Sequence, residues 1–172
     1  TAPLARVPAK PPAYADLAAR MGALHPTLRR KRLTVAAAES CTGGLLGAIL
    51  SEHSGSSDYF RGGMEVYSDH AKTVLAEVAP QLIHSHGAVS SVVAAALARS
   101  ALEKLGATIG LGITGIAGPT GATPGKPVGL VYIAIDGPML QTVTKKQWPF
   151  DRAGNRLASV GVALDLLAEA AG

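Results

Sequence analysis

The stretch Ala36-Ala37-Ala38-Glu39-Ser40-Cys41-Thr42-Gly43-Gly44 decides how this chain folds. An apolar run over 33–38, typical of a buried strand, breaks at small polar residues, and a helix-forming run over 45–50 follows at once. A strand, a tight turn and a helix in this order place side chains and backbone N–H groups at the carboxyl edge of a sheet, where open α/β sheets bind ligands. The paired glycines let a ligand approach the backbone closely. An ordinary loop in which Thr42 caps the helix is the alternative.

The composition predicts a cytoplasmic protein with an aliphatic core. Of its 172 residues, 48% are hydrophobic but only 4% are aromatic, so Ala, Val, Leu and Ile must fill the interior of one domain. No apolar run approaches the roughly 20 residues that cross a bilayer, and no signal peptide is visible. The single cysteine excludes an internal disulfide and is consistent with a reducing cytosol. We therefore expect a soluble, intracellular protein without membrane contact.

Positive charge is concentrated in the first 32 residues. These hold seven Lys or Arg and one acid, a net charge of +6, whereas residues 33–172 hold nine Lys or Arg and eleven acids, a net charge of −2. The run Arg29-Arg30-Lys31-Arg32 is a candidate nucleic-acid patch. A solvated surface explains the same run, and this simpler interpretation is favoured.

Hydrophobic periodicity and turn residues predict alternating strands and helices. The expected helices cover residues 14–24, 43–51, 69–78, 80–84, 91–105 and 154–170, and the expected strands cover residues 33–38, 63–67, 107–113, 128–135 and 141–148. Pro26 is expected to end the first helix, and the last two strands to form an antiparallel hairpin. The alternation favours a three-layer α/β/α sandwich with a mixed, mostly parallel sheet. Residues 1–12, with four prolines, are expected to be a flexible tail, and residues 13–172 a single domain.

A second glycine-rich turn, Thr114-Gly115-Ile116-Ala117-Gly118-Pro119, follows the expected strand 107–113. Parallel neighbouring strands would bring both turns to one sheet edge, where one turn could hold a phosphate and the other an oxyanion through backbone N–H groups. Neither turn has the spacing of a Walker A loop or of Gly-x-Gly-x-x-Gly. The pattern therefore argues against a nucleoside triphosphatase and against a dinucleotide-binding domain.

Tyr67 and Lys72 are candidates for proton transfer. Lys72 lies at the start of a predicted helix, where the helix dipole disfavours a cation and burial would lower the pKa of the amine further. A lysine that is neutral part of the time can act as a base on a serine hydroxyl, directly or through Tyr67. A surface lysine and a packed tyrosine are the alternative. The five histidines show no metal-ligand spacing.

Six motifs in order resemble a known family. They are Ala-Glu-Ser-Cys-Thr-Gly-Gly (38–44), Gly-Ser-Ser (55–57), Tyr-Ser-x-x-Ala-Lys (67–72), His-Gly-Ala-Val-Ser (86–90), Thr-Gly-Ile-Ala-Gly-Pro (114–119) and Lys-Pro-Val-Gly (126–129). Together they resemble the C-terminal domain of competence/damage-inducible protein A (CinA), a family that includes stand-alone nicotinamide mononucleotide deamidases. The resemblance covers about residues 13–170.

The resemblance implies hydrolysis of the carboxamide of nicotinamide mononucleotide, giving nicotinic acid mononucleotide and ammonia. It implies that Ser40 is the nucleophile, Lys72 the general base and Tyr67 a relay or orienting group, with Thr114 beside the reacting centre. It implies no metal or cofactor, and a homodimer. The residues expected to bind substrate are Thr42, Gly43, Gly44, Gly115, Ile116, Ala117, Gly118, Lys126 and Arg152.

Several alternatives stay open. The chain departs from the family pattern in the loop before Lys126, which lacks an acidic residue and a double glycine, and at Phe150, which replaces a glycine. These departures bear on phosphate and ribose contacts. Cys41 is a possible nucleophile, although a small buried residue is the favoured interpretation, and Glu39 is expected to anchor the turn through hydrogen bonds. A non-catalytic partner in competence or DNA damage, contacting a nucleotide, a nucleic acid or a recombination protein, is the rival to the enzyme.

Overall fold

One five-stranded sheet forms the middle layer of the computed structural model, which describes residues 7–172. The strands are β1 (Val35–Glu39), β2 (Phe60–Glu65), β3 (Ile109–Gly115), β4 (Leu130–Asp136) and β5 (Gln141–Gln147). Their order across the sheet is β2-β1-β3-β4-β5. β1 is parallel to β2 and β3, whereas β4 is antiparallel to both of its neighbours, so four strands run in one direction. The mixed, mostly parallel sheet and the late hairpin are confirmed.

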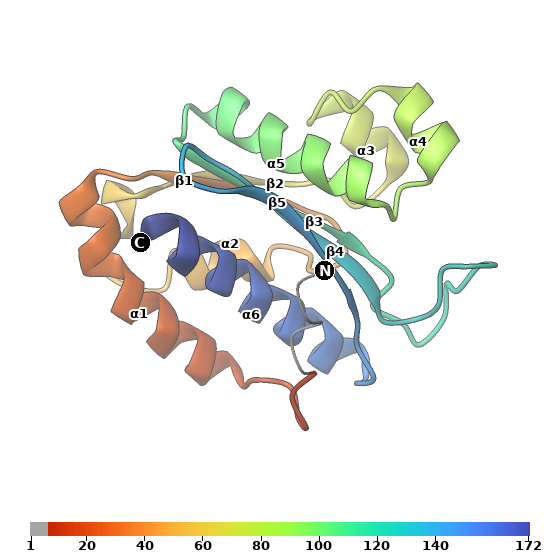
Figure 1. Ribbon diagram of the computed structural model, residues 1–172, viewed down its shortest axis with the longest axis horizontal. Coiled ribbons are helices and arrows are strands. Elements are labelled where there is room, and N and C mark those ends of the chain that lie inside the picture. Colours follow the sequence, from red (N-terminus) through yellow and green to blue (C-terminus); the bar gives the residue numbers. More distant parts are fainter. Residues whose placement is uncertain (1–6) are drawn as a thin grey trace.

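Helices cover both faces of this sheet. They are α1 (Tyr14–Lys31), α2 (Leu45–Leu50), α3 (Asp69–Val74), α4 (Pro80–His86), α5 (Ser91–Leu105) and α6 (Arg152–Ala171), with a single 3₁₀ turn over Ser56–Asp58. Figure 1 shows α1, α2 and α6 on one face, and α3, α4 and α5 on the other. The three-layer sandwich is therefore confirmed. No helix in residues 7–172 has the length and apolar character needed to cross a membrane.

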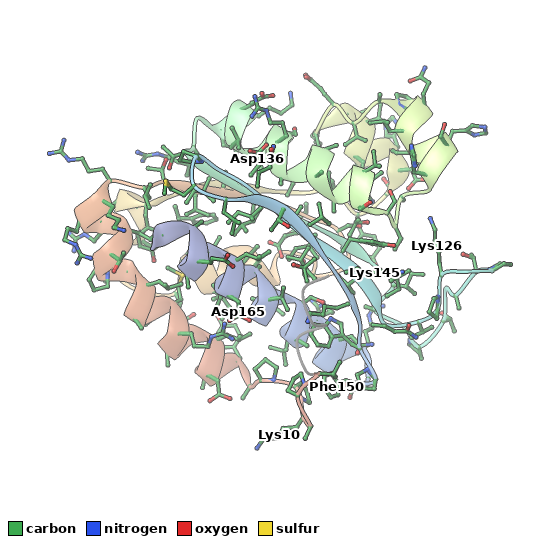
Figure 2. All side chains as sticks on the ribbon, in the orientation of Figure 1. Lys10, Lys126, Asp136, Lys145, Phe150 and Asp165 are labelled. Carbon is green, nitrogen blue, oxygen red and sulfur yellow. The ribbon has the colours of Figure 1, made fainter. Side chains whose placement is uncertain are left out.

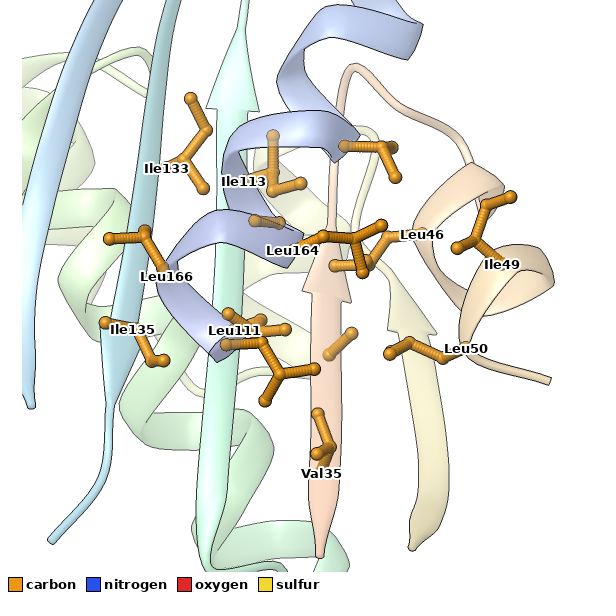
Figure 3. Packing of buried hydrophobic residues seen from close by; sticks show 14 of the residues in the cluster. Val35, Leu46, Ile49, Leu50, Leu111, Ile113, Ile133, Ile135, Leu164 and Leu166 are labelled. Carbon is orange, nitrogen blue, oxygen red and sulfur yellow. The ribbon is translucent and has the colours of Figure 1, made fainter. Parts of the chain in front are cut away.

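The apolar run of β1 serves two cores at once. Successive side chains of a strand point to opposite faces, and all five residues of β1 are buried. Val35 and Ala37 belong to the core under α1, α2 and α6, which includes Leu111 and Leu164 (Figure 3). Ala36 and Ala38 belong to the core under α5. A strand covered on both sides explains why this segment of the sequence shows no polar alternation.

Two glycines of β3 let α5 pack directly on the sheet. A Cβ atom added to Gly110 would clash with the carbonyl oxygen of Ala98, and one added to Gly112 would lie 2.6 Å from the backbone nitrogen of Ala98. These distances are shorter than real Cβ contacts allow, so backbone meets backbone at this interface. The close approach fixes the distance between α5 and the sheet.

Pro26 does not end the first helix, and that expectation is wrong. α1 continues through Pro26 to Lys31 and ends with Arg32 in a left-handed conformation at φ 54°. Tertiary packing outweighs the lost backbone hydrogen bond. Leu28, in the extra turns, is fully buried, and the ammonium of Lys31 donates to the final carbonyls of α6.

The expected helix over 69–78 is too long. α3 ends at Val74, and the chain then turns through Glu77, whose φ of 52° lies in the left-handed region. The N–H of Val78 donates to the carbonyl oxygen of Lys72 and ties this turn to α3.

The expected tail falls partly on residues 1–6, which lie outside the described residues. Pro11 and Pro12 are half-buried beside α6. A Cβ atom on Gly154 would lie 3.0 Å from Cγ of Pro11, and one on Gly161 would lie 3.7 Å from Cγ of Pro12. These prolines thus lie against glycines of the last helix.

Candidate functional site

Glu39, the last residue of β1, organises the turn that follows. Its buried carboxylate accepts the hydroxyl of Thr42 at 2.7 Å and the backbone N–H groups of Leu46 and Gly47 at 2.8 and 2.9 Å. The expectation that Glu39 anchors the turn is confirmed. Thr42 does not cap α2; Gly44 occupies the cap position without a side-chain bond. Because Glu39 already uses the first amides of α2, they are not free for a ligand.

Ser40 and Lys72 contact each other directly. Ser40 follows β1, and Lys72 lies on α3, whose start is capped by the hydroxyl of Ser68. The ammonium of Lys72 donates to Oγ of Ser40 at 3.0 Å. It also donates to the carbonyl oxygens of Val66 at 2.9 Å and Tyr67 at 3.3 Å. The three acceptors match the three hydrogens of one ammonium group.

Burial changes the acidity of Lys72. The residue is only 2% exposed. Desolvation lowers the pKa of its amine from the ordinary value of 10.5, and the nearby carboxylate of Asp69 opposes this shift only in part. A lysine of lowered pKa beside a serine hydroxyl is the arrangement of a base and a nucleophile.

Ser40 opens onto a cleft of about 230 Å³. Its walls are the two glycine-rich turns, Tyr67 of the β2–α3 link, and the start of α6. The lining residues are Ser40, Cys41, Tyr67, Gly115, Ile116, Ala117, Gly118, Thr120, Gly121 and Arg152. Seven of the thirteen residues predicted for catalysis or substrate binding therefore line this cleft. An eighth, Lys72, lies directly behind Ser40.

The phenol of Tyr67 lies at the mouth of this cleft. Tyr67 is 62% exposed, and its phenolic oxygen accepts a hydrogen bond from the guanidinium of Arg152 at 3.0 Å. Only the backbone carbonyl of Tyr67 contacts Ser40 and Lys72. Of the two roles predicted for Tyr67, this geometry favours orientation over relay.

A second cleft of about 620 Å³ adjoins the first and shares Ala117 and Arg152 with it. Arg152 and Arg156 line this second cleft, one helical turn apart on α6. Arg152 donates to the carbonyl of Gly118 at 2.8 Å, and Arg156 donates to the carbonyl of Thr42 at 2.9 Å. Each arginine thus ties one glycine-rich turn to α6. Their guanidinium groups can bind an anion.

Asn155 positions the second turn from inside the protein. It is 1% exposed, its amide donates to the carbonyl of Ala117 at 2.9 Å, and its side-chain oxygen accepts the N–H of Phe150 at 3.1 Å. Asn155 and Arg156 are not among the site residues predicted from the sequence. The spacing Arg-x-x-x-Arg, which places two arginines on one helix face, was the available signal.

Five of the predicted residues do not line the cleft. The hydroxyl of Thr114 donates to the carbonyl of Ala88 at 2.8 Å from a buried position at the end of β3. Lys126 lies on the extended loop, where its ammonium donates to the carbonyl of His86 at 2.7 Å (Figure 2). Thr42 is buried against Glu39. The other two are Gly43 and Gly44.

The surroundings of Gly43 and Gly44 are of opposite charge. The guanidinium of Arg156 lies beside Gly43, whereas the carboxylate of Glu65 lies directly over Gly44. A phosphate at Gly44 would meet this carboxylate as well as that of Glu39. The second cleft is also lined by Asp151, whose carboxylate accepts the N–H of Gly154, but two arginines line it as well, so it is the better place for an anion.

Cys41 does not have the properties of a nucleophile. Burial raises the pKa of its thiol to about 12, with Glu39 adding to the shift. The thiolate is the reactive form of cysteine, so this thiol is inert near neutral pH. Within residues 7–172, no group of three His, Cys, Asp or Glu side chains is placed to hold a metal ion.

Known proteins match both the sequence and the fold. The CinA C-terminal domain family matches residues 18–171. A CinA-like protein of Koribacter versatilis is 53% identical over 140 residues, which cover 81% of this chain and 34% of that protein. A CinA-like protein of Acidobacterium capsulatum is 49% identical over the same shares of each chain. The chain spans about a third of the length of these curated relatives.

Solved structures agree with these relatives. A competence/damage inducible protein from Agrobacterium tumefaciens is 32% identical with a TM-score of 0.86, covering 94% of this chain and 98% of that chain. A competence-damaged protein (CinA) superfamily protein from Escherichia coli is 27% identical with a TM-score of 0.87, covering 96% of this chain and 94% of that chain. By sequence and by fold, the chain belongs to the CinA C-terminal domain family.

Proposed function

We propose that this chain is an amidohydrolase that converts nicotinamide mononucleotide to nicotinic acid mononucleotide and ammonia. The observation that carries the proposal is the 3.0 Å contact between Nζ of Lys72 and Oγ of Ser40, buried behind an open cleft. The motif resemblance suggests the substrate, and the arrangement of the side chains suggests the order of proton transfers. Cytoplasmic pyridine-nucleotide salvage is the proposed setting.

The two carbonyl oxygens around Lys72 aim its amine at Ser40. When the amine is neutral, its two hydrogens can stay on the carbonyls of Val66 and Tyr67, at 2.9 and 3.3 Å. The lone pair is then directed at the remaining neighbour, Oγ of Ser40. The desolvation that lowers the pKa of Lys72 increases the fraction of this neutral form.

The reaction then follows from this arrangement. Oγ of Ser40 forms a bond to the carboxamide carbon as its proton passes to Lys72, and the C–N bond breaks as Lys72 returns that proton to the departing ammonia. Lys72 next takes a proton from a water molecule whose oxygen bonds to the ester carbon, and the bond from that carbon to Oγ of Ser40 breaks as Lys72 returns the proton to Oγ. Backbone N–H groups can stabilise the oxyanion; in the part of the chain described, the N–H of Ala117, which lines the cleft, is not used in an internal hydrogen bond.

The two adjoining clefts suggest how the nucleotide lies. The nicotinamide ring would occupy the smaller cleft beside Ser40, and the phosphate would lie against Arg152 and Arg156 in the larger one. Arg152 borders both clefts and orients Tyr67. Arginine forks suit a phosphate dianion.

The test is ammonia release from nicotinamide mononucleotide by the Ser40→Ala variant. We expect a loss of about 10³-fold or more, because the nucleophile is gone, with little change in Tm. The matched control is Ser54→Ala, an exposed serine outside the clefts, which should keep full activity. Ammonia release by Ser40→Ala at the wild-type rate would reject the proposal.

The same assay separates the enzyme from a non-catalytic partner in competence or DNA damage. Nicotinamide mononucleotide that binds to the wild-type chain but stays intact after long incubation would favour that rival. The homodimer implied by the family resemblance is likewise proposed, and sedimentation of the chain would measure it.

A further inference from the structure

The end of α1 and the start of β2 enclose an open hollow of about 850 Å³. Its lining is polar, with four arginines, and comprises Pro26, Arg29, Arg30, Arg32, Thr34, Ser57, Asp58 and Arg61. Arg29, Arg30 and Arg32 come from the basic run singled out in the sequence, and Arg61 joins them from 29 residues further along. The fold thus concentrates charge that is dispersed in the sequence.

Most of this positive charge has no acidic partner. Arg29 pairs with Asp58 at 2.7 Å. Within residues 7–172, no carboxylate forms an ion pair with Arg30, Arg32 or Arg61. Lys31, from the same run, points away and caps the carboxyl end of α6. Three exposed guanidinium groups therefore remain for a ligand.

The chemistry of the lining indicates the ligand. Arginine binds phosphate through paired N–H groups, so the ligand carries several phosphates. The hollow is open and exposes no aromatic ring, so it offers neither a stacking surface for unpaired bases nor an enclosed pocket for a small molecule. We propose that this hollow binds the sugar-phosphate backbone of duplex nucleic acid without reading its sequence.

This surface is separate from the amidohydrolase site. The hollow borders Thr34 at the amino end of β1, whereas Ser40 follows the carboxyl end of the same strand. In Figure 1 the end of α1 lies at the left and the glycine-rich loop after β3 extends to the right. Binding at one end should leave the chemistry at the other unchanged.

The experiment measures the anisotropy of a labelled random-sequence duplex of about 20 base pairs against increasing salt. Three phosphate contacts, one for each unpaired arginine, predict that the logarithm of the association constant falls with the logarithm of the salt concentration with a slope of about −2.7. The affinity should therefore fall about 40-fold from about 50 to about 200 mM salt. In the variant Arg32→Gln/Arg61→Gln one contact remains, and the slope should drop to about −0.9.

The matched control is Lys10→Gln/Lys145→Gln, which removes the same charge from exposed positions outside the hollow (Figure 2). It should keep the wild-type slope, and both variants should keep wild-type ammonia release and Tm. If Arg32→Gln/Arg61→Gln does not fold, Arg30→Gln/Arg32→Gln provides the same test. Three results would overturn the proposal. They are an equal reduction of the slope in the control variant, duplex binding that does not depend on salt, and binding of single strands or of tripolyphosphate that is tighter than binding of the duplex.

Discussion

At the scale of single residues, the groups around one lysine are the central feature of the molecule. Lys72 is buried among two carbonyl oxygens and one hydroxyl, and no carboxylate shares a hydrogen bond with it among the described residues. Such a site disfavours the charged amine. Under the proposed function this cost in stability falls on the residue that accepts a proton, which agrees with the general trade-off between stability and activity.

The buried amine makes stability depend on pH. The pKa of Lys72 is lower in the folded chain than the ordinary 10.5 of the unfolded chain. Between these two values the unfolded chain binds more protons, so the free energy of unfolding rises with pH. We expect the Tm of wild type, relative to Lys72→Met, to rise as the pH increases toward 10.5. The variant Lys145→Met, at an exposed position, serves as the control. A difference in Tm between wild type and Lys72→Met that stays constant with pH would contradict burial of the Lys72 amine as the cause.

Tyr67 offers a test of orientation against relay. Its phenol bonds Arg152 and not Lys72, so Tyr67→Phe should raise KM for nicotinamide mononucleotide with a loss in kcat/KM of about 10-fold. Steady-state kinetics of ammonia release give both constants. A fall in kcat of about 10³-fold with unchanged KM would instead mark Tyr67 as a proton relay.

The meeting of Ser40 with Lys72 could be predicted from sequence, because each follows a neighbouring parallel strand at the same sheet edge. The partner of the Tyr67 phenol could not. It comes from Arg152, 85 residues away, and depends on how α6 packs across the sheet. Local patterns do not encode such a long-range approach.

At the scale of elements, backbone contact between α5 and β3 holds the layer that carries Lys72. We expect Gly112→Ala to lower the free energy of unfolding by about 2 kcal/mol or more, because the added methyl must displace the backbone at Ala98. Gly63→Ala, on the edge strand β2, is the control. Its Cβ would lie 3.6 Å from the carbonyl oxygen of Ala37 and 4.0 Å from Cζ of Phe60, both ordinary contact distances, so a change within about 0.5 kcal/mol is expected. Urea titration measures both, and equal stabilities would refute the close packing.

Most elements were predicted to within a few residues, and the failures share a cause. Pro26 locally disfavours a helix, yet the buried Leu28 and the contact of Lys31 with α6 keep α1 intact beyond it. The helix predicted through residue 78 ends at Val74 because the chain turns at Glu77. In both places packing outweighs the local preference, because Leu28 is buried beyond Pro26, and Ala76 and Val78 are buried on either side of Glu77.

At the scale of the whole molecule, the fold places two candidate sites at opposite ends of β1. The carboxyl end holds Ser40 and the two adjoining clefts, and the amino end holds the arginine-lined hollow. Alternating elements were sufficient to predict the three-layer sandwich, since strands covered by helices on both sides have few other solutions. The arginine cluster was not predictable, because it joins the end of α1 to β2.

The central claim is that Ser40 and Lys72 act as one unit, and a double-mutant cycle of ammonia release from nicotinamide mononucleotide tests it most directly. Ser40→Ala and Lys72→Met should each lower kcat by about 10³-fold or more, and the double variant should be no slower than the single variants. Losses that multiply in the double variant would contradict the account, because they would mean that the two residues contribute independently.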